Sequence, residues 1–207
     1  QLAYRFYPKF RIPRWVAARR GIYSEAIKHH GCPIDGVIGF IDGTRMGVCR
    51  PKAGQEEQYS GYIKAHNQLY LAICFPDGTF CLRGPVDRKN NDLGALHLLH
   101  LTDEDIKNEI TGPYYFIGGD GIFQSVGSHV VTCQVNERVN AAERKRFSTS
   151  RLAVEWLFGV LKQTCPYIDS KKKHRMLGTD PQVKFQAACV IVQALNAIQN
   201  NIISKQF

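Results

Sequence analysis

The stretch Val37–Thr44 constrains the fold of this chain more than any other, because it joins a buried strand to a carboxylate. Its sequence is Val-Ile-Gly-Phe-Ile-Asp-Gly-Thr, so an apolar run ends on Asp42 and then breaks at a glycine. An apolar run of this length, bounded by turn residues, is typical of a central strand that is covered on both faces. A carboxylate at the end of such a strand is rigidly held and still reaches solvent, which suits a metal-binding or catalytic acid. The alternative for Asp42 is an ordinary solvated loop residue.

The composition favours a single soluble domain that binds a polyanion. The 207 residues are enough to bury a core, and 27 Lys and Arg against 18 Asp and Glu give a net charge of +9. Nucleic acid is the first partner that this excess suggests, and an anionic membrane is the second. The seven cysteines form no C-x-x-C pair, so we expect core thiols in a reducing compartment rather than a zinc site or disulfides. The chain has no run of about 18 apolar residues and no signal peptide, which predicts an intracellular protein outside the membrane, and its start at Gln1 suggests a fragment.

Apolar periodicity and turn residues predict five strands and five helices. The strands are expected at Val37–Thr44, Asn67–Phe75, Thr79–Arg83, Tyr114–Gly118 and His129–Val135, with Pro76–Asp77–Gly78 as a hairpin turn. The helices are expected from Pro13 to about His30, at Asp92–Leu101, at Asp103–Ile110 behind a Thr102 cap, at Ala141–Thr164 and from Pro181 onward. The helix at Ala141–Thr164, including Leu152 and Trp156, should be mostly buried. The last helix should bury a stripe made of Val183, Ala187, Val190, Ile191, Ala194, Leu195 and Ile198. Residues 1–36 are expected to form a basic, helical lead-in and residues 37–207 the main domain.

Two further acids stand in positions that relate them to Asp42. The apolar strand at Tyr114–Gly118 is also followed by glycine and an acid, Asp120, and Glu155 lies on the long buried helix. If the two strands are neighbours, Asp42 and Asp120 lie side by side and Glu155 reaches them from the covering helix. This arrangement fits an α/β, RNase H-like mixed sheet flanked by helices. Three acids of this kind also fit a site for two divalent cations, which prefer anionic oxygen ligands.

Several short motifs follow one another in a recognisable order over about three quarters of the chain. They are Ile41–Asp42–Gly43–Thr44; Tyr59–Ser60–Gly61–Tyr62 with Lys64 and His66; Pro76–Asp77–Gly78; Gly84–Pro85 and Asn91–Asp92; Gly118–Gly119–Asp120; and Arg151, Val154–Glu155, Phe158–Gly159 and Leu161–Lys162. In this order, and with 34 residues between Asp120 and Glu155, the chain resembles the DDE transposases of the PIF/Harbinger type. That family also contains domesticated relatives.

The resemblance implies a site and its partners. Asp42, Asp120 and Glu155 would be the catalytic and metal-binding triad for two Mg²⁺ or Mn²⁺ ions, with Asp92 as an auxiliary position. The implied substrate is double-stranded DNA, and the implied location is the nucleus. A homo-oligomer and a Myb-like partner protein are further candidates.

Basic residues around these acids are candidates for DNA contacts. They are Arg45, Lys64, His66, Arg151, Lys162, Lys171, Lys172, Lys173 and Arg175. Arg151 and Lys162 share one helix face with Glu155, so they either stabilise the helix through an ion pair or neutralise the acids and hold a phosphate. The basic run that begins at Lys171 is equally well a solvated loop.

Two functions remain open from the sequence. The first is a metal-dependent nuclease and strand-transfer enzyme, in which water attacks a phosphodiester and the freed 3′-hydroxyl then attacks target DNA. The second is a domesticated, non-catalytic descendant that binds DNA or a protein. The three intact acids favour the first.

Overall fold

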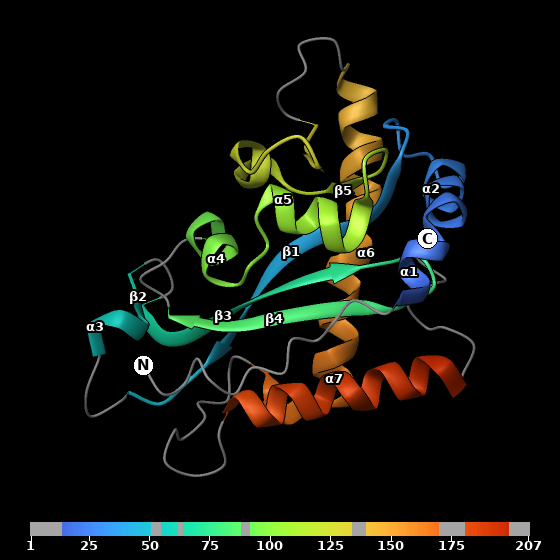
Figure 1. Cartoon of the computed structure of the whole chain (residues 1–207). Coiled ribbons are helices and arrows are strands. Elements are labelled where there is room, and N and C mark those ends of the chain that lie inside the picture. The colour runs from blue at the N-terminus through green and yellow to red at the C-terminus, as the bar shows by residue number, and fades with distance from the viewer. Residues whose placement is uncertain are drawn as a thin grey trace.

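The apolar run at Val37 forms β1 (Val37–Gly47), which lies inside a six-stranded mixed sheet (Figure 1). The computed structural model describes residues 14–50, 55–61, 64–87, 92–133, 140–169 and 181–198. The other strands are β2 (Tyr59–Ser60), β3 (Ala65–Cys74), β4 (Phe80–Asp87), β5 (Phe116–Gly118) and β6 (Val130–Val131). β3 lies antiparallel beside β1 and pairs antiparallel with β2 and β4, whereas β5 and β6 extend the sheet in parallel on the other side of β1. The predicted α/β class is confirmed.

β1 is longer than predicted, and Asp42 lies within the strand rather than at its end. β3 stays paired with β1 as far as Gly47, opposite Asn67, so the ladder carries the strand past the glycine at position 43. On the other side, the pairing with β5 ends at Phe40, opposite Gly118. β5 therefore no longer covers this edge of β1 at Asp42, which leaves the carboxylate at the rim of the sheet although the strand continues.

The β3–β4 hairpin is confirmed, with Pro76–Asp77–Gly78 as its turn. Phe75 N–H donates to the carbonyl of Thr79 at 2.9 Å, and Gly78 has a positive φ of 76°, which favours glycine. β6 covers only part of the predicted strand, whose last two residues lie outside the described ranges. The short β2 was missed, because a two-residue strand has no periodicity of its own.

The helices occur where they were predicted, but several are shorter, and the one predicted from Pro13 to about His30 is divided at Arg19 into two. They are α1 (Arg14–Ala18), α2 (Arg20–His29), α3 (Gln55–Gln58), α4 (Asp92–Leu98), α5 (Asp103–Ile106), α6 (Ala141–Thr164) and α7 (Pro181–Ile198). A π-helical turn continues α5 at Lys107–Thr111, and 3₁₀ turns lie at Gly121–Ser125 and Pro166–Ile168. Thr102 caps α5 as predicted, and Asn140 starts α6 through a capping box with Glu143. Among the α-helices in the described ranges, only α3 had no counterpart among the predicted helices.

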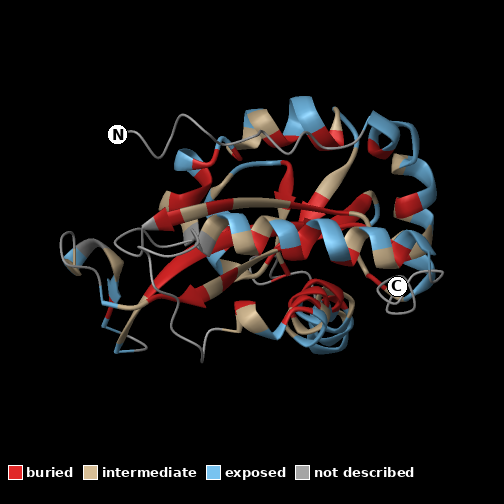
Figure 2. Ribbon diagram, turned by 90° about the horizontal axis from the view of Figure 1, so that it is seen from below, coloured by how far each residue is buried: buried red, intermediate tan, exposed pale blue. Residues whose placement is uncertain are grey.

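Hydrophobic clusters lie on both faces of the sheet. α6 and α7 pack on one face, around Phe40 and Phe185, and α1, α4 and α5 pack on the other, around Ile41. α2 contributes Tyr23 to the second cluster and Ile27 to the first, so the helices before β1 share the core of the sheet. The strands are buried along most of their length, while the helices carry most of the exposed residues (Figure 2). All seven cysteines carry thiols rather than disulfides, and six are buried, as predicted.

Two predictions about buried helix faces are wrong. On α6, Leu152 and Trp156 are 43% and 51% exposed. On α7, most of the predicted stripe is exposed, and the buried stripe is Phe185, Ala188, Cys189, Val192 and Asn196. Phe185 stacks on Tyr70 of β3 with ring centroids 4.3 Å apart, because a large aromatic surface gains most from burial. Within the described ranges, no helix is long and apolar enough to cross a membrane.

Candidate active site

Asp42 and Asp120 come together because β1 and β5 run parallel. Phe40 of β1 pairs with Gly118 of β5, and each acid stands two residues beyond this pair. A Cβ at Gly118 would lie 2.5 Å from the Phe40 ring, so glycine lets the strand and the ring pack. The predicted contact between the two acid-bearing strands is confirmed.

α6 brings Glu155 toward the same rim of the sheet. Phe147 packs edge-to-face on Phe40 with centroids 5.8 Å apart, and Arg151 and Glu155 follow Phe147 on one face of the helix. One guanidinium nitrogen of Arg151 lies 3.3 Å from Asp42 Oδ2, and another lies 2.7 Å from Glu155 Oε1. Asp42 and Glu155 therefore flank a single guanidinium. The ion pair between Arg151 and Glu155 was one of the two predicted roles of Arg151.

The electrostatics link all three acids. Burial raises the pKa of Asp42 to about 6, from an ordinary value of 3.8. The N–H of Gly43, which donates to Asp42 Oδ1 at 2.9 Å, and the Arg151 guanidinium both lower this pKa without offsetting burial. The carboxylates of Asp120 and Glu155 raise it further. The cluster thus holds its negative charge at a free-energy cost, which a bound cation would reduce.

The turn that follows β5 orients Asp120. Its Oδ1 accepts a hydrogen bond from the N–H of Ile122 at 2.9 Å, and Asp120 thereby caps the 3₁₀ turn Gly121–Ser125. Phe123 anchors this turn in the core, where it is fully buried. The hydrogen bond holds the carboxylate in place without neutralising its charge.

The three carboxylates suit a hard divalent cation but do not form a ready metal site. Carboxylate oxygens are ligands that Mg²⁺ and Mn²⁺ prefer. Among the residues that the structure describes, no three His, Cys, Asp or Glu side chains form a group that could hold a metal ion. Arg151 binds Asp42 and Glu155 at the same time, so a cation would reach these oxygens only if the guanidinium moved aside.

The predicted DNA-contacting residues are spread over several surfaces. Arg45 stands an odd number of residues after Asp42 on β1, so strand alternation directs its side chain to the opposite face of the sheet. Lys64 is exposed in the turn before β3, and His66 packs edge-on against Tyr59 with ring centroids 5.4 Å apart. Only Arg151 among the predicted basic residues forms a described ion pair with the acids.

The remaining predicted positions are only partly described. Lys162 lies on α6 and is half-buried. Asp92 is the first residue of α4, and its side chain is outside the described part of the structure. The basic run of Lys171, Lys172, Lys173 and Arg175 also lies outside the described residues.

A shallow apolar groove beside Glu155 was not predicted. It has a volume of about 230 Å³ and is lined by Leu152, Glu155, Trp156, Gly159, Val160 and Gln163 of α6. Trp156 is half-exposed there. The sequence carried a signal for this groove, because the second half of α6 has apolar residues around much of its circumference and one sheet face cannot bury all of them.

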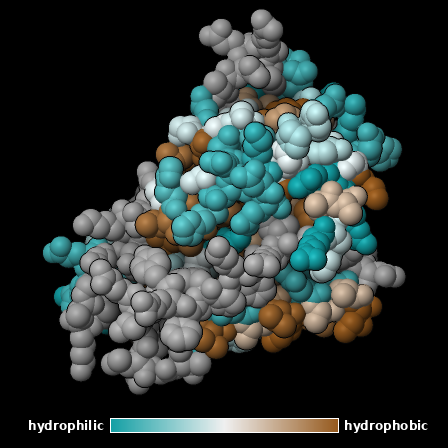
Figure 3. Space-filling view, in the orientation of Figure 1, coloured by the Kyte–Doolittle hydropathy of each residue, from teal (hydrophilic) through white to brown (hydrophobic). Residues whose placement is uncertain are grey.

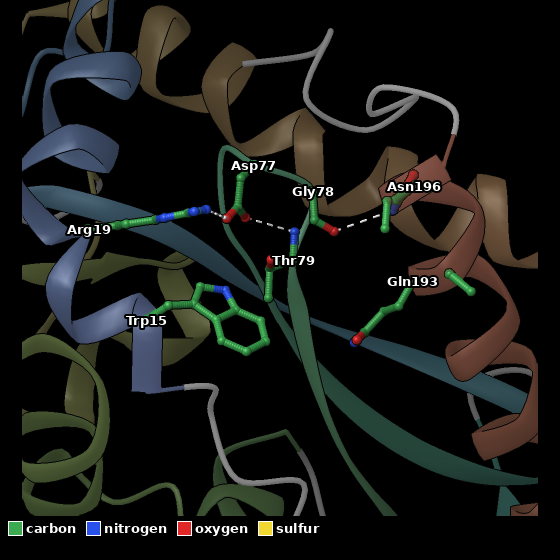
Figure 4. Close-up of a pocket in the computed structure, with 9 residues that line it drawn as sticks. Trp15, Arg19, Asp77, Gly78, Thr79, Gln193 and Asn196 are labelled. Atoms are coloured by element: carbon green, nitrogen blue, oxygen red, sulfur yellow. Dashed lines mark hydrogen bonds and ion pairs between the residues drawn. The ribbon is translucent and has the colours of Figure 1, made fainter.

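A larger cavity of about 660 Å³ lies between α1, the β3–β4 turn and α7 (Figure 4). Arg19, which lies between α1 and α2, pairs with Asp77 at 3.1 Å, and Asn196 of α7 donates to the carbonyl of Gly78 at 3.3 Å. The turn is thus tied to the N-terminal helices and to α7. Trp15 forms an exposed apolar wall. None of the three acids lines this cavity, which makes it a separate surface from the candidate active site.

Comparison of the chain with protein family models, curated proteins and solved structures found no match. The function of this chain is therefore not inferred from a relative. The acids, their charges and the fold that holds them carry the functional argument.

Proposed function

We propose that this chain is the catalytic domain of a PIF/Harbinger-type DDE transposase, a metal-dependent nuclease and strand-transfer enzyme that acts on double-stranded DNA. The observation that carries the proposal is geometric: Asp42 and Asp120 each follow a paired position of two neighbouring parallel strands by two residues, and Asp42 shares the Arg151 guanidinium with Glu155 of the covering helix. The net charge of +9 supports a polyanionic substrate.

The sheet supports an RNase H-like fold. Such a fold needs the first apolar strand and the strand that carries the second acid to be neighbours, with a helix that carries the third acid across them. β1 and β5 are paired and parallel, and α6 contacts β1 through Phe147 and Arg151. The antiparallel strands β3 and β4 then complete the sheet on the other side of β1.

The proposed roles follow from where each side chain is attached. Asp42 and Asp120 offer oxygen ligands from the rigid sheet, and Glu155 offers one from α6. These three carboxylates would hold a pair of Mg²⁺ or Mn²⁺ ions, which would supply activation of the attacking oxygen and stabilisation of the leaving one. Arg151 compensates part of the negative charge of Asp42 and Glu155 while no cation is bound, and its guanidinium, once released, is suited to a DNA phosphate.

The groove on α6 adds a second kind of DNA contact beside the acids. Trp156 presents half of its surface to solvent next to Glu155. Aromatic rings in such positions stack on unpaired bases with little sequence preference. We therefore assign Trp156 to holding a strand near the site of cleavage.

The test separates cleavage from binding. Glu155→Gln is nearly isosteric and removes one negative charge, so DNA binding should hold or tighten slightly while nicking of a labelled duplex with Mn²⁺ falls by orders of magnitude. Glu104→Gln makes the same chemical change at an exposed position on α5 and should leave both quantities unchanged.

Two outcomes would count against the proposal. Equal nicking by Glu155→Gln and wild type would remove Glu155 from the site and with it the enzyme assignment. DNA binding without nicking by either protein would instead favour a domesticated, non-catalytic descendant.

A further inference from the structure

α7 carries a second apolar stripe on the face turned away from the core. Val183, Val190, Ile191 and Ile198 are between 44% and 78% exposed. Ala187 and Ala194, which lie between them on the same face, are exposed as well. Figure 3 shows hydrophobic side chains along the lower edge of the molecule, where α7 lies.

This face has the composition of an interface core. α7 has 18 residues, and Lys184 is its only charged one, whereas 22% of the whole chain is charged. A helix that is apolar on two opposite faces is typically covered on both. Depletion of charge together with exposed aliphatic side chains is the pattern that protein interfaces share at their centre.

The stripe is symmetric about its own midpoint. Its residues follow one another at intervals of 4, 3, 1, 3 and 4 positions, from Val183 to Ile198. A two-fold axis between Val190 and Ile191 brings Ala187 to the height of Ala194 in an antiparallel second copy. It also brings Val183 to the height of Ile198, so large side chains meet large ones and alanine meets alanine. The alanines leave room for the two helix backbones to approach closely.

We propose that α7 is the interface of a symmetric homodimer, in which the α7 helices of two copies pack antiparallel along this stripe. A two-fold interface requires a patch that complements itself, and the spacing of the stripe meets that requirement. Each copy has a net charge of +9, so two copies repel each other elsewhere and approach best through a face that is nearly free of charge. The proposal does not rest on the proposed nuclease function.

The surface beside the stripe enlarges the contact. Ala194 and Ala197 of α7 also line the cavity of Figure 4, whose far wall is the half-exposed Trp15. The stripe alone extends over about 23 Å at about 1.5 Å per residue. The area that the stripe would bury is smaller than that of a standard interface, which is about 800 Å² per partner. We therefore expect a reversible dimer with a Kd on the order of 1–100 µM.

The test uses charge at the two alanines. Sedimentation of the whole chain from about 1 µM to about 100 µM should show a monomer–dimer equilibrium. Ala187→Glu alone and Ala194→Lys alone should each weaken dimerisation at least about tenfold, because each buries an unpaired charge. The double variant Ala187→Glu/Ala194→Lys should recover most of the loss, because antiparallel packing sets each glutamate against the lysine of the other copy.

The controls distinguish this arrangement from others. Ile22→Glu changes a 68% exposed apolar residue on α2 and should leave the dimer intact. Far-UV circular dichroism should match wild type in every variant, and so should the melting temperature at protein concentrations where wild type is monomeric, since the substituted sites face solvent in the monomer. A wild type that stays monomeric at about 100 µM would overturn the proposal. A double variant that dimerises no better than the single ones would exclude the antiparallel pairing.

Discussion

Asp42→Asn is expected to stabilise the protein at neutral pH in the absence of divalent cations. The pKa of Asp42 is raised from 3.8 to about 6, chiefly by burial and further by Asp120 and Glu155, in spite of Arg151. A raised carboxyl pKa means that the folded state favours the protonated form. The stability that the protonated Asp42 side chain contributes is therefore full below about pH 4 and is lost as the pH rises through about 6. Asparagine resembles the protonated acid and does not lose this contribution.

The magnitude follows from the size of the shift. A shift of about two pKa units corresponds to about 3 kcal/mol, so the variant should be more stable than wild type by about 2–3 kcal/mol at about pH 7.5. The difference should fall to about 1–2 kcal/mol at about pH 5. For a chain of this length, the larger value raises the melting temperature by about 6–12 °C.

Thermal and urea unfolding in EDTA at the two pH values would measure this effect. Asp35→Asn makes the same charge change at an exposed residue and should alter stability by less than about 0.5 kcal/mol at either pH. Added Mg²⁺ should stabilise wild type more than Asp42→Asn, which narrows the gap between them. A variant that is no more stable than wild type at about pH 7.5, or a gap that does not shrink toward about pH 5, would refute the reasoning.

Two further predictions concern the packing around the site and across the sheet. Gly118→Ala should destabilise the protein by about 1–3 kcal/mol in urea unfolding, because its Cβ would meet the Phe40 ring at 2.5 Å. Gly159→Ala on α6 has open space around it and should instead stabilise the protein by about 0.5–1 kcal/mol. Two substitutions that change stability in the same direction would contradict this account. Burial acts to raise the pKa of Asp103, but hydrogen bonds from His129 hold this pKa below its usual range. Asp103→Asn should therefore lower the stability by about 1–2 kcal/mol at neutral pH. This loss should fade as the pH drops through the lowered pKa. A cost that is independent of pH would assign the loss to packing rather than to the charge.

The sequence was sufficient to predict the strands that hold the acids. The runs before Asp42 and Asp120 are apolar and end near glycine, and that local pattern is enough to mark buried strands. The end of β1 could not be predicted in the same way, because the partner strand β3 decides where the ladder stops, and β3 lies elsewhere in the sequence. Register between distant segments is a property of pairing and not of either strand alone.

Arg151 shows, within the site, that contacts between distant segments could not be predicted from local sequence. Its position four residues before Glu155 predicted an ion pair along α6, and that pair is present. Its second partner, Asp42, comes from a strand more than a hundred residues earlier, so no helical spacing could indicate it. α7 is a harder case, because its two faces are similarly apolar. The choice of buried face followed from the fit of Phe185 against Tyr70, which only the folded chain decides.

The candidate active site and the outer face of α7 share a physical property that connects both proposals. At Asp42 the isolated chain keeps a carboxylate partly desolvated beside two other acids, and a single guanidinium compensates it only in part. On α7 the isolated chain keeps valines and isoleucines in water, where they gain nothing from the hydrophobic effect. The first feature lowers the stability of the monomer without cations, and the second leaves apolar surface that adds nothing to this stability. Each is relieved by a different kind of binding, a divalent cation at the acids and a second helix at α7. The two costs are therefore separable: added Mg²⁺ should raise stability at any protein concentration, whereas the stability gained through α7 should grow with protein concentration.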